Sequence, residues 1–130
     1  MTTIIEDYVS FETAKLLKEK GFNEQTRDFY SFENNIWIHR NTYKYNYFNL
    51  DISIWENCYS CPTLQMTMKW LLKKYNIFIC ILFLEESNGF GYTIEDIVKN
   101  KYIITSKNSS YKEIEDACEA AIKYSLEHLI

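Results

Sequence analysis

The 130-residue sequence contains only three glycines and one proline. These residues supply most tight turns and irregular loops, so their scarcity predicts short connections between regular elements. Long apolar stretches are also missing, because the longest run, residues 77–84, has eight residues. A helix that crosses a bilayer needs about 20 apolar residues. The sequence therefore predicts a protein with no membrane-spanning helix.

An excess of positive charge is also absent, since 14 Lys and Arg face 18 Asp and Glu, which gives a net charge of −4. Proteins that coat nucleic acid depend on Lys and Arg to neutralise the phosphate backbone. The composition therefore makes nucleic acid an unfavoured partner overall. It leaves open a local basic patch.

The first eight residues lack the cationic start and apolar stretch of a secretory signal peptide. The four cysteines are accordingly expected to be reduced thiols rather than disulfides. These two observations predict a cytoplasmic protein.

Aromatic residues are abundant, with 11 Tyr, 8 Phe and 3 Trp making up 17% of the chain. Disordered chains have few aromatics and a high net charge, so this composition predicts a folded protein. A chain of this length falls within the usual size of one core. We therefore expect a single α+β domain over residues 1–130.

Periodicity and turn signals predict the order α-β-β(-β)-α-β-β-β-α, a mainly antiparallel sheet with three helices. Ser10 and Gly21 bracket a helix over residues 11–20, as N-cap and as left-handed C-terminal residue. Further helices are predicted over residues 62–75 and 110–130. Strands are predicted in this order: 27–32, 36–39, one or two strands within 41–55, 77–84, 90–98 and 101–106. A short polar turn, Glu33-Asn34-Asn35, separates the first two and predicts a hairpin.

The last helix has the clearest pattern. Residues 110–113 read Ser-Tyr-Lys-Glu, which is the pattern of a capping box in which Ser110 and Glu113 satisfy orphan backbone N–H groups. An apolar stripe of small and branched residues follows, which predicts the buried face. Its members are Ile114, Ala117, Cys118, Ala121, Ser125 and Leu129.

Cys58 and Cys61 have the only spacing that resembles a motif. Two thiolates two residues apart can chelate zinc, but a structural site needs two further ligands, and the sequence supplies no convincing pair. A redox pair would place the first cysteine at a helix start, whereas Cys58 lies upstream of one. We therefore expect a turn between a strand and a helix, with no metal, no cofactor and no catalytic residue.

The segment 39–47 combines aromatic and basic side chains. Such interleaving can bind an anion or stack on bases, and it can equally form the inner face of a strand. We predict it as the ligand-binding segment, with packing as the open alternative. The predicted site residues are His39, Arg40, Tyr43, Lys44, Tyr45 and Tyr47.

Residues 59–63, Tyr-Ser-Cys-Pro-Thr, followed by Lys69-Trp70-Leu71 and Asn76-Ile77, resemble a group of small uncharacterised proteins from gut Bacteroidales and their phages. The closing residues 120–130 are similar to the last helix of the same group. The resemblance implies a phage or prophage accessory protein in a bacterial cytoplasm. It carries over no functional residue.

Taken together, these features predict a non-enzymatic phage or mobile-element accessory protein that binds a host protein or sequesters a small anionic ligand. Two alternatives stay open: a small enzyme with a dispersed active site, and a nucleic-acid binder acting through residues 39–47. We also expect a homodimer. Residues 77–84 are apolar at every position and so need cover on both faces of the sheet, which a second copy can provide.

Overall fold

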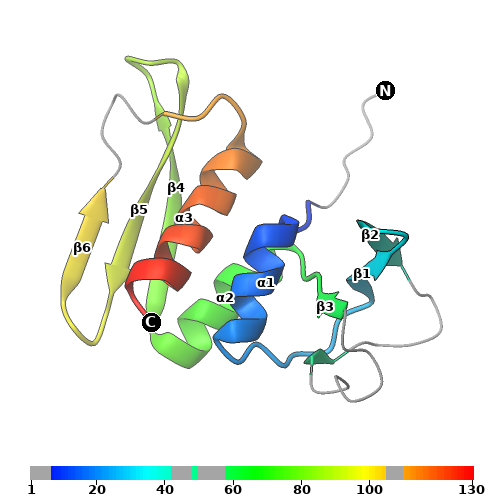
Figure 1. The fold of residues 1–130 in the computed structure, drawn as a ribbon. Helices are drawn as coiled ribbons and strands as arrows, with labels where there is room; N and C mark the ends of the chain where they lie inside the picture. The colour runs from blue at the N-terminus through cyan, green and yellow to red at the C-terminus, as the bar shows by residue number, and fades with distance from the viewer. Residues whose placement is uncertain (1–6, 42–47, 50–57, 105–109) are drawn as a thin grey trace. The chain divides into compact units, whose positions relative to one another are not determined.

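The computed structural model describes residues 7–41, 48–49, 58–104 and 110–130. Within these ranges it contains three helices and two three-stranded antiparallel sheets, in the order α-β-β-β-α-β-β-β-α (Figure 1). The predicted α+β class and element order are therefore confirmed. The strands are divided between two sheets rather than joined in one.

The chain divides into two compact units, Met1–Thr63 and Leu64–Ile130. Each unit holds one sheet and at least one helix. A single domain requires that the two units unfold in one transition. The single domain over residues 1–130 therefore stays a prediction. None of the helices in the described ranges is long and apolar enough to cross a bilayer.

Helix α1 (Phe11–Glu19) opens the first unit and has both predicted ends. The Ser10 side chain accepts a hydrogen bond from the first turn, as an N-cap does. At the other end Gly21 has φ +87°, the left-handed conformation that glycine adopts without strain. The Phe22 N–H then donates to the Leu17 carbonyl oxygen at 2.9 Å, which closes the helix as a Schellman motif.

The sheet of the first unit has the strand order β2-β1-β3. Its strands are β1 (Asp28–Glu33), β2 (Ile36–Asn41) and β3 (Cys58–Ser60). The predicted hairpin joins β1 to β2 through Asn34 and Asn35, with φ +51° and +66°. Two consecutive left-handed residues form a type I′ turn, which matches the twist of paired strands. The predicted strand or strands within residues 41–55 fall almost wholly outside the described residues.

The second unit contains α2 (Leu64–Tyr75), β4 (Ile77–Leu84), β5 (Gly89–Asp96), β6 (Lys101–Ile104) and α3 (Ile114–His128). The strand order is β4-β5-β6. Helix α3 packs on β4 and β5, while α2 packs on β4 and on α3. The helices therefore cover one face of this sheet.

Strand β4 has one well-buried part. Ile77 and Ile79 lie on the covered face with Ile94 of β5, and all three are buried. Phe78, on the other face, is 45% exposed, and Phe83 near the strand end is 57% exposed. The expectation that both faces are covered is therefore wrong at these two positions of the single chain.

The predicted capping box of the last helix is not formed. Helix α3 begins at Ile114, its N-cap is Glu113, and no side chain caps it. The reason is a tertiary contact: the backbones of Tyr111 and Phe90 exchange two hydrogen bonds of 2.6 and 2.7 Å. This pairing holds Tyr111 in an extended conformation beside β5, so the helix cannot begin at Ser110.

The buried stripe of α3 agrees with the prediction at its centre and differs at its ends. Four predicted residues are buried: Ala117, Cys118, Ala121 and Ser125. Ile122 and Leu126 are also buried, whereas Ile114 is 49% exposed and Leu129 is half-buried. Ile114 and Leu129 share the angular position of the stripe but stand at the two helix ends, where packing is incomplete.

Gly89→Ala should destabilise the protein by about 1–3 kcal/mol, because an added methyl group has no room. A Cβ at this position would lie 2.8 Å from the Tyr111 carbonyl oxygen, so the extended pairing would have to shift. Ser110→Ala is the matched comparison and should change the stability by less than about 0.5 kcal/mol, since Ser110 caps no helix. Thermal melting followed by circular dichroism measures both. Equal losses in the two variants would contradict this account.

Candidate binding surface

The register of the first sheet gathers large side chains on one face. Tyr30 of β1 lies directly opposite His39 of β2 and Tyr59 of β3. Phe32, two residues farther along β1, lies opposite Trp37. Because side chains alternate along a strand and paired residues share a face, all five project to the same side of the sheet.

Phe11 of α1 adds a further ring to this side. Its ring centroid lies 4.5 Å from that of Trp37, 5.6 Å from that of Tyr59 and 5.8 Å from that of Tyr30. Trp37 in turn stacks on Tyr59 at 5.0 Å, and Phe32 lies 5.2 Å from Trp37. We call these five residues, Phe11, Tyr30, Phe32, Trp37 and Tyr59, the aromatic face.

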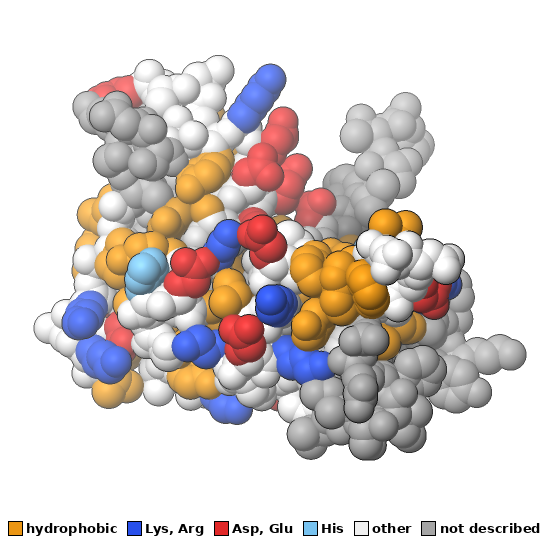
Figure 2. All heavy atoms as spheres, in the orientation of Figure 1, with side chains coloured by type: hydrophobic (Ala, Val, Ile, Leu, Met, Phe, Trp, Pro, Cys, Tyr) orange, Lys and Arg blue, Asp and Glu red, His pale blue; other side chains and the backbone are white. Residues whose placement is uncertain are grey.

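The aromatic face is only partly buried within the chain. Phe32 is 40% exposed, and the other four rings are half-buried. In Figure 2, hydrophobic side chains gather at the surface between α1 and the β1–β2 hairpin. The rings thus contact one another while keeping a shared outer surface.

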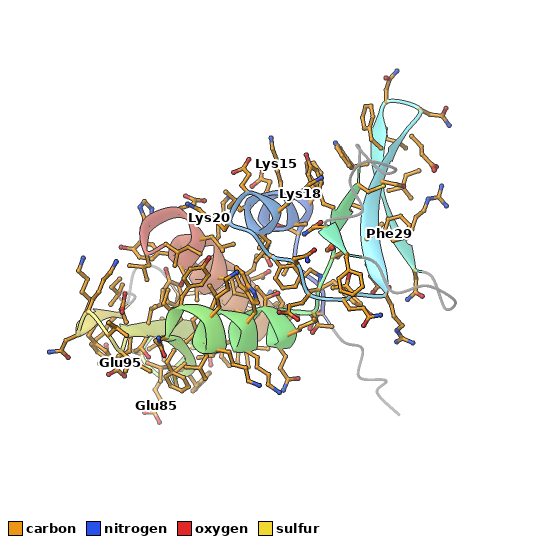
Figure 3. All side chains as sticks on the ribbon, turned by 90° about the horizontal axis from the view of Figure 1, so that it is seen from below. Lys15, Lys18, Lys20, Phe29, Glu85 and Glu95 are labelled. Carbon is orange, nitrogen blue, oxygen red and sulfur yellow. The ribbon has the colours of Figure 1, made fainter. Side chains whose placement is uncertain are left out.

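Lys18 lies at the border of this face (Figure 3). Its ammonium nitrogen donates a hydrogen bond of 3.0 Å to the Cys58 carbonyl oxygen and stands 4.7 Å from the centroid of the Tyr59 ring. Desolvation lowers the pKa of Lys18, and the neighbouring Cys58 thiol opposes that shift. A cation over a ring is favourable, so Lys18 stabilises the orientation of Tyr59.

Cys58 is 5% exposed. Burial raises its pKa, with Lys18 acting in the opposite direction and Glu33 adding to the increase. Nucleophilic cysteines have a lowered pKa, because the thiolate is the reactive form. Cys58 therefore remains a thiol at neutral pH and has the character of a small core residue.

His39, a predicted site residue, lies at the edge of the aromatic face. Its ring centroid is 5.2 Å from that of Tyr8 and 5.3 Å from that of Tyr30. Its Nε2 atom is 3.6 Å from Oδ2 of Asp28, whose side chain is 3% exposed. A carboxylate at this distance attracts a protonated imidazole and repels an anionic ligand.

Arg40, the next predicted site residue, points to the opposite face of the sheet. Its Nε donates to the Ser31 hydroxyl oxygen at 3.1 Å, and its guanidinium forms a salt bridge with Glu33. The structure therefore does not bring His39 and Arg40 together. The other predicted site residues, Tyr43, Lys44, Tyr45 and Tyr47, lie outside the described residues.

Sequence reasoning missed Phe11, Trp37 and Tyr59 as members of one surface. A signal for one pair was present, because a two-residue turn at Asn34 and Asn35 aligns Phe32 with Trp37. No local pattern linked Phe11 or Tyr59 to that hairpin, because both come from distant segments.

A metal site is not evident in the described part of the chain, where no group of three or more His, Cys, Asp or Glu side chains converges. All four cysteines are free thiols. Cys61 is 1% exposed, and its sulfur lies 3.6 Å from the Val9 carbonyl oxygen. Cys58, the first residue of β3, and Cys61, directly after β3, are thus packed core residues.

Comparison of the chain with protein-family models, curated proteins and solved structures gave no match.

Proposed function

We propose that this protein is a non-enzymatic accessory protein of phage or mobile-element type that binds a host protein through its aromatic face. The observation that carries the proposal is a connected cluster of five aromatic rings that remain partly exposed to water. Trp, Tyr and Phe are among the side chains that are enriched in the centres of protein interfaces. They offer a large apolar area with few rotatable bonds.

A protein partner fits this surface better than a small anionic ligand. The five rings lie side by side, with neighbouring ring centroids 4.5–5.8 Å apart, so they offer a broad apolar surface. Lys18, the cation at the border of this face, is engaged with β3, and Arg40 lies on the opposite face of the sheet, paired with Glu33. His39 lies beside the Asp28 carboxylate, which disfavours an anion there.

Removing two rings of the aromatic face should abolish partner binding. In a pull-down from the bacterium that carries the gene, the wild type should retain one stoichiometric protein. The double variant Phe32→Ser, Trp37→Ser should lose it. With the purified partner we expect the Kd to rise about 30-fold or more, the effect of losing a hot-spot contact of about 2 kcal/mol.

The control is the double variant Ile97→Ser, Val98→Ser, which removes two exposed apolar side chains, 52% and 73% exposed, from the second unit. It should bind like the wild type. Circular dichroism establishes that both variants are folded. A partner held equally by the wild type and the Phe32, Trp37 variant would contradict the proposal, as would the absence of any retained protein.

A further inference from the structure

Strand β6 is an edge strand of the β4-β5-β6 sheet among the described strands (Figure 1). Helix α3 packs on β4 and β5, and helix α2 packs on β4 and α3, so both helices lie over the other two strands. Tyr102 and Ile104 are 61% and 60% exposed, Lys101 is exposed and Ile103 is half-buried. Within the described part of the chain, β6 is therefore open along its whole length.

The sheet register shows which backbone groups of β6 point outward. The Ile97 N–H donates to the Asn76 carbonyl oxygen at 3.0 Å, just beyond the β4–β5 ladder. Hydrogen-bonded pairs alternate along an antiparallel ladder, so the odd-numbered residues of β5 bond to β4 and the even-numbered ones bond to β6. The even-numbered residues of β5 lie opposite the odd-numbered residues of β6. The backbone N–H and C=O groups of Tyr102 and Ile104 therefore point away from β5.

An apolar row crosses the helix-covered face of this sheet and ends at β6. Ile79 of β4, Ile94 of β5 and Ile103 of β6 lie directly opposite one another. Ile79 is 9% exposed and Ile94 0% exposed, whereas Ile103 is only half-buried. Tyr102 and Ile104 project to the other face, where both are exposed. A further strand beside β6 would cover apolar side chains on both faces of the sheet.

We propose that β6 pairs antiparallel with β6 of a second copy of this chain, across a two-fold axis at Ile103. Tyr102 of each copy then lies opposite Ile104 of the other, so the outward-pointing N–H and C=O groups of these residues bond to each other. Ile103 lies opposite Ile103 of the second copy, which continues the isoleucine row across the axis. The two three-stranded sheets become one sheet.

Side chains and charge both suit a second copy as the occupant of this edge. The register sets Tyr102 against Ile104 twice, and an aromatic residue opposite a β-branched one is a favourable cross-strand pair. A lysine commonly protects an edge strand from pairing, and Lys101 is the lysine of β6. Antiparallel pairing about Ile103 places the two copies of Lys101 four residues apart, about 14 Å. That separation exceeds the screening length of about 8 Å at physiological salt, so the two lysines do not oppose this register.

A cysteine at the axis tests the register. Ile103 would occupy a non-hydrogen-bonded pair, in which the two Cα atoms are about 4.5 Å apart, within the disulfide range of about 4.4–6.8 Å. Ile103→Cys is made together with Cys80→Ser, because the other three cysteines are buried. Diamide, which takes up the two thiol hydrogens as it oxidises two thiols to a disulfide, should convert this variant into a covalent dimer. The control, Ile97→Cys in the same background, places its thiol at a 52% exposed position away from the axis and should stay largely monomeric on a denaturing gel.

A proline at Ile104 tests the backbone pairing. Ile104→Pro removes an N–H that points away from β5, and proline is tolerated on an edge strand at such a position. Ile104→Val keeps the N–H and the branched shape. In sedimentation equilibrium at micromolar concentration, the wild type and Ile104→Val should have twice the 15.6 kDa of one chain, and Ile104→Pro should have the mass of one chain. Circular dichroism establishes that both variants are folded.

A wild-type mass of 15.6 kDa would overturn the proposal. A folded Ile104→Pro that stays dimeric, or an Ile103→Cys that cross-links no faster than Ile97→Cys, would show that a different surface holds the copies together. If Ile104→Pro does not fold, the cross-linking comparison decides. The variant Phe32→Ser, Trp37→Ser of the aromatic face should keep the dimer mass, so failure of this proposal and failure of the proposed function are distinguishable.

Discussion

Ala121→Asp should lower the free energy of unfolding of the second unit by about 3 kcal/mol or more. Ala121 is 0% exposed and lies at the centre of the buried stripe of α3. That helix packs on β4, β5 and α2, so the carboxylate would enter a buried layer between these elements. Small domains are stable by only about 5–15 kcal/mol, so this loss is a large share of the total.

The matched control is Ala120→Asp, the same substitution one residue earlier. Ala120 is half-buried rather than fully buried, so its new carboxylate can reach water. Urea unfolding followed by circular dichroism should give a much lower midpoint for Ala121→Asp than for Ala120→Asp. Equal midpoints would show that the buried face of α3 lies elsewhere.

The same variant tests the prediction of a single domain. Amide resonances from residues 7–41 report on the first unit, and those from residues 64–104 report on the second. If the chain is one domain, both sets should lose their dispersion at the same urea concentration in Ala121→Asp. Retention of the first set alone would show two independently folding units.

Local signals predicted the elements whose ends depend on local chemistry. The N-cap at Ser10 and the left-handed Gly21 define α1, and both depend only on residues within one turn. The Asn34-Asn35 turn defines the first hairpin in the same way. These features were predictable because no distant contact competes with them.

Other predictions were wrong because a distant contact decided the outcome. The Ser110–Glu113 pattern favours a capping box, yet the backbone pairing of Tyr111 with Phe90 takes that segment away from the helix. Two backbone hydrogen bonds to an existing strand outweigh one side-chain cap. The strand 77–84 was predicted correctly in extent, but its coverage depends on packing that the sequence does not encode locally.

The predicted binding site was only partly informative for a related reason. His39 and Arg40 are adjacent in sequence, and adjacent residues of a strand point to opposite faces. Only His39 joins the side on which the aromatic face lies. Phe11 and Tyr59 reach that face from α1 and β3, and their proximity follows from the tertiary fold alone.

The side chain of Asn49 connects two separate segments of the first unit. Its side-chain Nδ2 donates to the Phe22 carbonyl oxygen, and its Oδ1 accepts from the Ser60 N–H, both at 2.8 Å. The residue is 5% exposed, so both bonds are shielded from water. One amide therefore joins the segment after α1 to the end of β3. No periodicity or turn pattern in the sequence marks this residue.

Asn49→Leu should destabilise the first unit by roughly 2–5 kcal/mol, because it keeps the size of the side chain and removes both hydrogen bonds. The Phe22 carbonyl and the Ser60 N–H would each be left buried without their partner, and an unsatisfied buried group costs about 1–3 kcal/mol. The control is Asn41→Leu at the exposed end of β2, which should change stability by less than about 0.5 kcal/mol. Urea unfolding monitored by the amide resonances of residues 7–41 gives both values. A loss for Asn49→Leu no larger than that of Asn41→Leu would mean that water replaces the amide at no cost, and that Asn49 does not join the two segments.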